Sequence, residues 1–304
     1  MKIRNILSHA FKVVAKHRDI FLVFSFVYAV MLFTALFLGA LGGLTLVLVI
    51  FVFLPLQFSF YLIAKKMQEE KPIEPNDIYL GFKGILTSLA LGSKMMFRGF
   101  LNGVVAFVIG LLVGGIGLSY FIMSNYPSLL EVITANPSNL DLIVVELDRY
   151  PIVVNLVIII YLLALVFAGF IYLKEASKNS IAPLVLFEAP FDLNSSIRIS
   201  RKVNKLKQNK LTLIYLIFLV ALIVVTSLSF GLGAYLFNAS GLDELVLVAL
   251  IFMMFSLLFA PLNILFVVVK SSYYQLFAKK EVLKILEEIK TGLESSQNDS
   301  NLKK

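Results

Sequence analysis

The sequence of 304 residues contains no cysteine, no tryptophan and only two histidines. Without cysteine the chain has no disulfide, no thiolate nucleophile and no thiolate-bound zinc or iron–sulfur centre. Charged residues make up 15% of the chain, below the roughly 25% of a soluble domain. Residues of the apolar set AVILMFWYC make up 59%, and the mean hydropathy is +0.91. These values exclude an ordinary water-soluble fold.

Six long apolar runs carry no Asp, Glu, Lys, Arg or His. They are residues 20–38, 44–64, 99–123, 152–173, 211–237 and 245–269. Each is about 20 residues or longer, enough to cross ~30 Å of hydrocarbon as a helix. Because a helix satisfies its own backbone hydrogen bonds in lipid, the runs predict an all-α bundle of six transmembrane helices. Gly39, Gly42 and Gly43 separate the first two runs and predict a tight turn.

The runs and their connectors use nearly the whole chain. We therefore predict one integral membrane domain over residues 1–293 and a disordered polar tail over 294–304. Residues 279–293 predict a cytoplasmic helix that ends at Gly292. The longest far-side connector, 124–150, predicts two short helices on the outer surface.

Basic residues are confined to alternate segments of the chain. Of the 27 Lys and Arg residues, all except Arg149 lie in the N-terminal segment, the second and fourth connectors and the C-terminal segment. The positive-inside rule assigns these segments, and both termini, to the cytoplasm of a multi-pass cell-membrane protein. The net charge of +8 therefore reflects orientation, and nucleic acid is not an expected partner.

A similar unit recurs in the cytoplasmic segments. Each segment ahead of a pair of spans has an amphipathic stretch that holds a small–apolar–basic triplet: Ala10-Phe11-Lys12, Gly81-Phe82-Lys83 and Ser196-Ile197-Arg198. The second and sixth spans also echo each other, as Pro55-Leu56-Gln57 and Pro261-Leu262-Asn263, whereas the fourth span lacks this element. We predict three parallel units, each a cytoplasmic amphipathic helix followed by a helical hairpin.

The fourth connector carries the most characteristic stretch. It contains Ile181-Ala182-Pro183-Leu184-Val185-Leu186-Phe187-Glu188 and then a Ser/Arg-rich helix over residues 195–207. This "P-x-x-x-x-E, then a Ser/Arg-rich helix" layout resembles uncharacterised prokaryotic polytopic membrane families, among them the membrane domain attached to some glycerophosphodiester phosphodiesterases. The resemblance covers most of the chain in layout and implies an all-helical membrane protein. It carries over no enzymatic residue, because the phosphodiesterase domain and its metal-binding carboxylates are missing from this sequence.

Gln57 and Asn263 are the most polar side chains expected inside the bilayer. Pro55 and Pro261 each remove an intrahelical hydrogen bond nearby and free a carbonyl. One interpretation is a substrate site between two broken helices. The other is an interhelical hydrogen bond with two packing kinks, worth about 0.6 kcal/mol per bond.

The Ser/Arg-rich helix carries a basic stripe at i, i+3, i+4 and i+7: Arg198, Arg201, Lys202 and Lys205. Anionic headgroups attract such residues by about 1 kcal/mol each near a membrane surface. The stripe is therefore the candidate contact for anionic lipids of the cytoplasmic leaflet. Simple cytoplasmic retention explains it equally well.

No catalytic constellation, metal cluster or cofactor motif is present, so we expect no enzyme activity and no cofactor. The spans also lack the Asp, Glu or His that bind a coupling ion in many transporters. The leading hypothesis is a non-catalytic, lipid-contacting accessory or scaffold protein. The alternative is a transporter of a small or lipidic solute with a site between the second and sixth spans, and a membrane-embedded lipid enzyme ranks third.

Overall fold

The computed structural model describes residues 3–42, 45–135, 140–188, 193–206, 210–240 and 244–301. Within these ranges every regular element is a helix and no strand forms. Six helices are long and apolar enough to cross a membrane, namely α2 (Arg18–Gly42), α3 (Thr45–Gln68), α5 (Ile85–Asn125), α8 (Pro151–Asn179), α11 (Lys210–Ser240) and α12 (Glu244–Tyr273). The predicted all-α class with six spans is thus confirmed, and the chain is an integral membrane protein.

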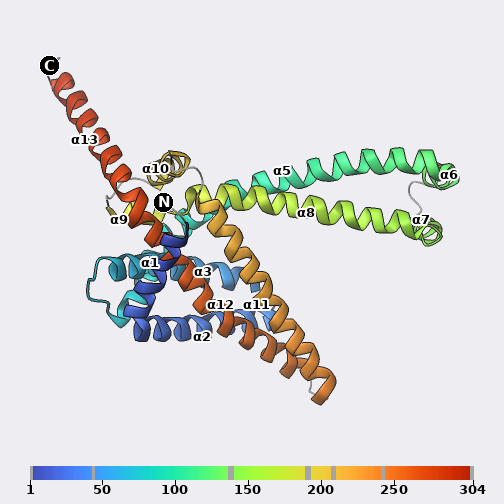
Figure 1. Ribbon diagram of the computed structural model, residues 1–304, viewed down its shortest axis with the longest axis horizontal. Helices are drawn as coiled ribbons and strands as arrows, with labels where there is room; N and C mark the ends of the chain where they lie inside the picture. The colour runs from blue at the N-terminus through green and yellow to red at the C-terminus, as the bar shows by residue number, and fades with distance from the viewer. Residues whose placement is uncertain are drawn as a thin grey trace. The chain divides into compact units, whose positions relative to one another are not determined.

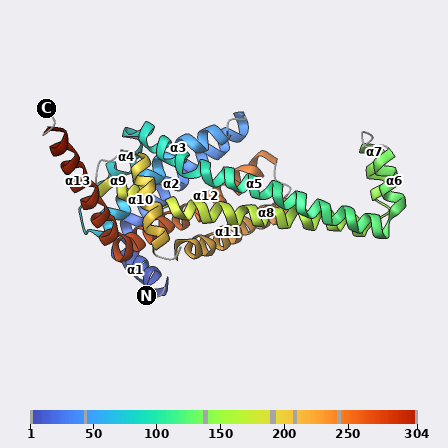
Figure 2. The same cartoon turned by 90° about the horizontal axis from the view of Figure 1, so that it is seen from above.

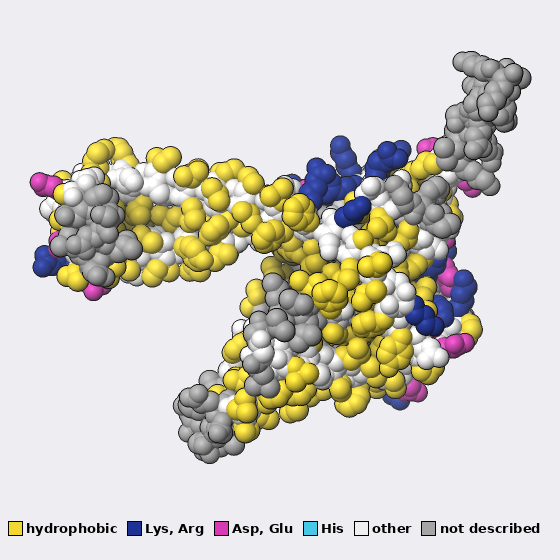
Figure 3. Space-filling model, turned by 180° about the vertical axis from the view of Figure 1, so that it is seen from behind, with side chains coloured by type: hydrophobic (Ala, Val, Ile, Leu, Met, Phe, Trp, Pro, Cys, Tyr) yellow, Lys and Arg dark blue, Asp and Glu magenta, His cyan; other side chains and the backbone are white. Residues whose placement is uncertain are grey.

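Five of the six predicted spans lie within one of these helices, and the remaining one departs from its helix by one residue (Figure 1). The run 44–64 begins one residue before α3, and residues 43 and 44, including the predicted turn glycine Gly43, lie outside the described ranges. Apolar side chains cover much of the helix surface in Figure 3, where a soluble protein would carry charge. Residues such as Val166 and Ile116 are 70% and 73% exposed, as expected of apolar side chains that face lipid.

The described residues form two compact units, and the single membrane domain over residues 1–293 stays a prediction. One unit is Met1–Met95 with Ser177–Lys304, and the other is Met96–Ala176. The reason lies in the third and fourth spans, which pack on each other along their length as a hairpin.

The hairpin unit is built by α5 and α8, which run side by side (Figures 1 and 2). Glycines of α5 face α8 at close range: a Cβ on Gly110 would lie 3.0 Å from Ala164 Cβ, and one on Gly99 would lie 3.2 Å from the Tyr172 ring. Small residues let two helix backbones approach in lipid, where packing rather than the hydrophobic effect drives association. The short helices α6 (Pro127–Ala135) and α7 (Leu140–Leu147) cover the far end, as predicted for connector 124–150.

The larger unit packs α2 against α3 and α12, and α12 against α11. The amphipathic helix α1 (Ile3–Lys16) lies across α12 and buries Ile6, Ala10 and Val13. Tyr28, Phe60 and Tyr273 are among the largest fully buried side chains of this core.

The remaining elements of this unit lie in its connectors and beyond the last span. They are the 3₁₀ helix η1 (Pro75–Tyr79), α4 (Leu80–Lys83), α9 (Ala182–Glu188), α10 (Leu193–Leu206), the π-helical turn η2 (Tyr274–Ala278) and α13 (Lys279–Asn301).

The second connector differs from the predicted single amphipathic helix. It is broken into η1, α4 and the start of α5, because Pro75 starts a 3₁₀ turn and Gly84 leaves the helical region at φ −106° and ψ 41°. The second connector also extends along the side of α3 and does not remain near the C-terminus of that helix. Lys66 Nζ donates to both Asp77 carboxylate oxygens at 2.8 Å, whereas Gly81 lies against Pro55, about 16 Å farther along the helix at ~1.5 Å per residue.

The C-terminal helix α13 continues through Gly292 to Asn301. The predicted end of this helix at Gly292 is therefore wrong. One glycine costs an established helix only about 1 kcal/mol relative to alanine, and no proline follows to stop the helix.

Candidate functional site

The two intramembrane amides meet at one tyrosine. Asn263 Nδ2 on α12 donates a hydrogen bond to the Tyr28 hydroxyl on α2 at 3.3 Å, and Gln57 on α3 interacts with the same hydroxyl. Tyr28 is fully buried and Asn263 is 8% exposed. Gln57 is half-buried, and the two amides named from the sequence form a polar trio with the buried Tyr28. Its third member could have been noticed, because Tyr28 is the one tyrosine of the first apolar run.

Aromatic rings enclose this trio. The Phe60 ring contacts Tyr28 edge-on at a centroid distance of 5.0 Å, and Phe53 and Phe259 lie at 6.4 Å. Three phenylalanine rings thus pack around the Tyr28 ring, and the side-chain amides of Asn263 and Gln57 contact its hydroxyl. The arrangement forms contacts among three spans.

The prolines that accompany the amides both lie within their helices. Pro55 has a specific partner, because its carbonyl accepts from Ser59 Oγ at 3.2 Å, and Ser59 Oγ in turn accepts from the Gly81 amide at 2.7 Å. A Cβ on Gly81 would overlap the Pro55 carbonyl. Pro55 therefore marks the place where the second connector docks onto α3, a relationship that no sequence pattern predicted.

The Ser/Arg-rich helix α10 caps the C-terminus of α8. Ser200 Oγ donates to the Lys178 carbonyl at 2.8 Å, and Asn204 Nδ2 donates to the Ser177 and Lys178 carbonyls at 3.1 and 3.0 Å. The last carbonyls of a helix have no hydrogen-bond donor within that helix, so Ser200 and Asn204 supply donors to the carbonyls at the end of α8. The buried face of α10 is consequently polar as well as apolar: it consists of Ser196, Ile199, Ser200, Val203 and Asn204.

The four residues of the predicted basic stripe on α10 differ in exposure, because one side of this helix packs against the end of α8. Arg198, Lys202 and Lys205 are exposed. Arg201 is half-buried, and its Nε donates to Asn179 Oδ1 at 2.7 Å. Arg201 thus has a structural partner within the protein, which the i, i+3, i+4, i+7 spacing could not reveal. Three exposed basic residues remain as the candidate contact surface.

A chain of ion pairs joins α3, α9 and α13. Glu188, the glutamate of the P-x-x-x-x-E stretch, lies 3.3 Å from Lys65 and 3.7 Å from Lys279. Lys279 also lies 3.3 Å from Glu69, which pairs with Lys71 at 2.7 Å. Burial raises the pKa of Glu69, but the Lys71 hydrogen bond and the charges of Lys65 and Lys279 outweigh it, so its pKa lies below the usual value.

Lys270 occupies the place in the sixth span that corresponds to Lys65 in the second, yet its surroundings differ. Its Nζ lies 4.3 Å from the centroid of Phe266, 4.6 Å from Tyr61 and 5.8 Å from Tyr215. The residue is 5% exposed. Cation–π contacts of this kind are worth up to about 2 kcal/mol each when desolvated. Lys270 therefore contacts aromatic rings, whereas Lys65 pairs with the carboxylate of Glu188.

The segment that follows Lys270 is rich in buried polar atoms. Ser271 Oγ, the Tyr273 hydroxyl and Gln275 Nε2 are buried and have no hydrogen-bond partner among the described residues. The backbone there widens into the π-helical turn η2. Such turns often occur at functional sites. In the described ranges, however, no three His, Asp or Glu side chains come together as ligands for a metal.

Comparisons with protein-family models, with characterised proteins and with solved structures give no match. The resemblance to the phosphodiesterase-associated membrane domain therefore stays a prediction.

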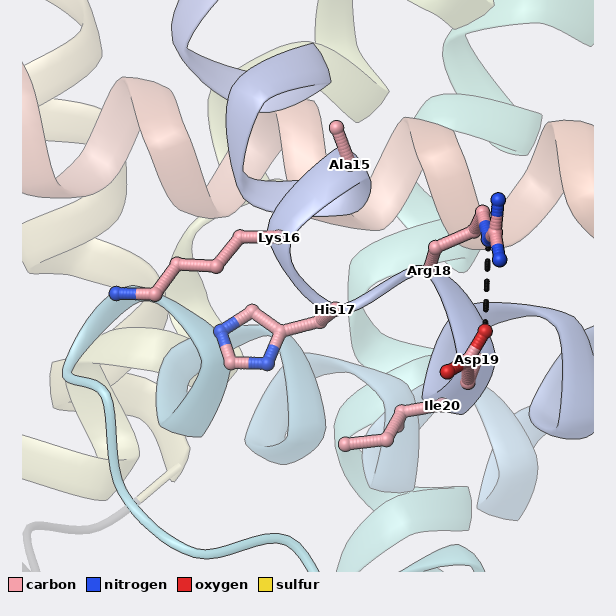
Figure 4. A pocket seen from close by; sticks show the side chains of 6 residues that line it. All are labelled: Ala15, Lys16, His17, Arg18, Asp19 and Ile20. Atoms are coloured by element: carbon pink, nitrogen blue, oxygen red, sulfur yellow. Dashed lines mark hydrogen bonds and ion pairs between the residues drawn. The ribbon is translucent and has the colours of Figure 1, made fainter.

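A cleft at the corner between α1 and α2 was not predicted. Its volume is about 290 Å³, and it is lined by consecutive residues: Ala15, Lys16, His17, Arg18, Asp19 and Ile20 (Figure 4). The signal in the sequence is the run Lys16-His17-Arg18, one residue ahead of the first apolar run.

Proposed function

We propose that the protein is a non-catalytic membrane scaffold whose helix α10 contacts anionic headgroups at the cytoplasmic leaflet of the cell membrane. The observation that carries the proposal is the two-sided character of α10. One face is fixed to the end of α8 by Ser200 and Asn204, and the other exposes Arg198, Lys202 and Lys205. Because α10 is already held in place, its basic face loses little conformational entropy when it binds a membrane. Three exposed basic residues contribute roughly 3 kcal/mol of binding free energy at an anionic surface.

The orientation of the chain supports this location. The second and fourth connectors and both terminal segments carry nearly all of the lysine and arginine. With six spans, both termini and α10 then lie on the cytoplasmic side. Anionic lipids give that leaflet its negative surface potential, so the basic face of α10 would meet an attractive field.

Transport, the alternative that the sequence left open, has less support. Gln57 and Asn263 both serve Tyr28, and phenylalanines surround that tyrosine. These contacts support the interpretation in which Gln57 and Asn263 join the spans rather than bind a solute. We therefore interpret the two amides as packing contacts.

A charge-reversal pair tests the proposal. Arg198→Glu with Lys202→Glu reverses two exposed charges at i and i+4 on α10, and Lys280→Glu with Lys284→Glu does the same on α13 as a matched control. The protein is reconstituted in nanodiscs that contain phosphatidylglycerol and phosphatidylcholine, and the bound lipid is identified by native mass spectrometry. We expect the α10 variant to lose at least tenfold in preference for the anionic lipid and the control to lose little. Equal preference in wild type and both variants would exclude the lipid role of α10.

A further inference from the structure

The N-terminal helix α1 carries a large apolar side chain on its surface. Phe11 is 56% exposed, whereas Leu7 and Val14, about one turn away along the helix, pack against the core of the larger unit. Arg4 and Lys12 are exposed as well. The outer edge of α1 therefore combines one aromatic ring with two cations.

Hydrogen bonds place α1 at a defined depth relative to two spans. His9 Nε2 donates to Gln68 Oε1 at 2.8 Å, and Gln68 Nε2 donates to Ser272 Oγ at 2.7 Å. Gln68 is four residues past the apolar run 44–64, and Ser272 is three residues past the run 245–269. At ~1.5 Å per residue, both side chains start roughly 4–6 Å beyond the hydrocarbon core. A headgroup layer is about 5–8 Å thick, so the middle of α1 lies at the level of the lipid headgroups.

Phe11 points away from the helices that hold α1. Ile6, Ala10 and Val13 form the buried face of α1, and His9 faces α3. Successive helical residues turn by about 100°, so Phe11 lies about 200° around the helix axis from His9. The two residues are about 3 Å apart along that axis, so Phe11 lies at a similar depth to His9.

The connection to the first span keeps α1 at the membrane surface. α1 ends at Lys16, and the membrane-spanning helix α2 begins at Arg18. Amphipathic helices at such a surface insert Phe and Leu side chains at the boundary between headgroups and acyl chains, with Lys and Arg on the polar face. Phe11, Arg4 and Lys12 match this distribution, and anionic headgroups attract the two cations.

We propose that the exposed edge of α1 is a lipid-binding surface at the cytoplasmic leaflet. The Phe11 ring inserts at the boundary between headgroups and acyl chains, and Arg4 and Lys12 lie next to lipid phosphates. The proposal goes beyond the scaffold function, because no residue of α10 takes part in it.

The absence of tryptophan from the sequence makes the depth of this edge measurable. Phe11→Trp gives a chain with one tryptophan, which is reconstituted in nanodiscs of phosphatidylglycerol and phosphatidylcholine, with or without lipid brominated in the upper part of its acyl chains. We expect brominated lipid to quench the fluorescence of this variant strongly and aqueous iodide to quench it weakly. Leu283→Trp, at a position of α13 that is 40% exposed, is the control and should show the opposite.

Two results would overturn the proposal. One is quenching of Phe11→Trp by iodide to the same extent as the control. The other is protection of Phe11→Trp from both quenchers, which would indicate a protein contact in place of lipid.

A second label guards against a folding defect in the tryptophan variant. Because the sequence has no cysteine, Phe11→Cys carries a single nitroxide spin label. We expect this label to be more accessible to oxygen, which dissolves in lipid, than to a water-soluble nickel chelate. Greater accessibility to the nickel chelate would contradict insertion of this edge into the membrane.

Charge variants test the two cations and separate this surface from α10. In the Phe11→Trp chain, omission of phosphatidylglycerol should lower the quenching by brominated lipid, and Arg4→Gln with Lys12→Gln should abolish that dependence. A dependence that persists would overturn the role given to the two cations. Arg198→Glu with Lys202→Glu on α10 should leave the quenching of Phe11→Trp unchanged.

Discussion

Asn263 on the last span and Tyr28 on the first span share a hydrogen bond of 3.3 Å, although 235 positions separate them in the chain. Because Gln57 reaches the same hydroxyl, three spans are joined at one buried point. Hydrogen bonds between helices in lipid are worth about 0.6 kcal/mol on average and rarely exceed 1.7 kcal/mol. The trio therefore helps to align the spans but does not dominate their stability.

This relationship predicts a mild effect of removing the amides. Gln57→Leu combined with Asn263→Leu should lower the free energy of unfolding by about 1–2 kcal/mol and leave the α10-dependent lipid preference unchanged. Thermal unfolding in nanodiscs, read by circular dichroism, measures the first quantity. If the folded double variant lost a transport activity that wild type shows in liposomes, the packing interpretation would be wrong.

Gly81 should be intolerant of any side chain. A Cβ there overlaps the Pro55 carbonyl, so Gly81→Ala must push the second connector away from α3 and cost about 1–3 kcal/mol of unfolding free energy. Gly115 on α5 has no neighbour within 4 Å of an added Cβ and serves as the control. Gly115→Ala should be neutral or slightly stabilising, because alanine favours helix. Similar unfolding midpoints for the two variants would contradict the close docking of Gly81.

Replacement of Lys65 and of Lys270 by methionine should have different effects on the free energy of unfolding. Lys65→Met leaves Glu188 with Lys279 at 3.7 Å as its remaining basic partner, and we expect a loss of about 1–3 kcal/mol, less than the cost of breaking an isolated buried pair. Lys270→Met removes a buried cation whose contacts, among the described residues, are with aromatic rings, so stability should stay the same or rise. Chemical unfolding in mixed micelles compares them. Equal losses would mean that the two sites are electrostatically alike.

Glu69 predicts a dependence of stability on acidic pH. Its pKa in the folded protein lies below the usual 4.5 because of Lys71, Lys65 and Lys279, despite partial burial. The folded state therefore binds this proton less readily than the unfolded state does, and the stabilisation is complete above pH 4.5 and is lost as the pH falls through the folded pKa. Glu69→Gln should remove part of the loss of stability measured between pH 5 and pH 3. An unchanged pH profile would show that the ion-pair chain does not contribute.

The sequence predicted the spans well because their signal is local. Each span is an uninterrupted apolar run, and the helix is the one structure that satisfies the backbone of a single segment in lipid. Gln57 and Asn263 were also found locally, as amides in apolar surroundings. Their shared partner was not found, because the choice of Tyr28 depends on how three helices pack.

The connectors were predicted less well, since contacts distant in sequence decide their structure. Gly81 donates a hydrogen bond to Ser59, and Arg201 donates one to Asn179. Neither contact can be inferred from the spacing of residues in the sequence. In each of the three triplets the small residue, Ala10, Gly81 or Ser196, is buried. The basic residue that ends each triplet is exposed. This common pattern fits the predicted repeat of three units, which stays a prediction.

The proposed lipid contact requires α10 to face the cytoplasm, and the absence of cysteine from the sequence allows this to be tested without background labelling of the protein. Single cysteines are placed at exposed Lys202 on α10 and at exposed Asp148 in the far-side connector, and cells are treated with a membrane-impermeant maleimide. We predict that Asp148→Cys reacts in intact cells and that Lys202→Cys reacts only after the membrane is permeabilised. Labelling of Lys202→Cys in intact cells, with Asp148→Cys protected, would contradict both the orientation and the proposed lipid contact.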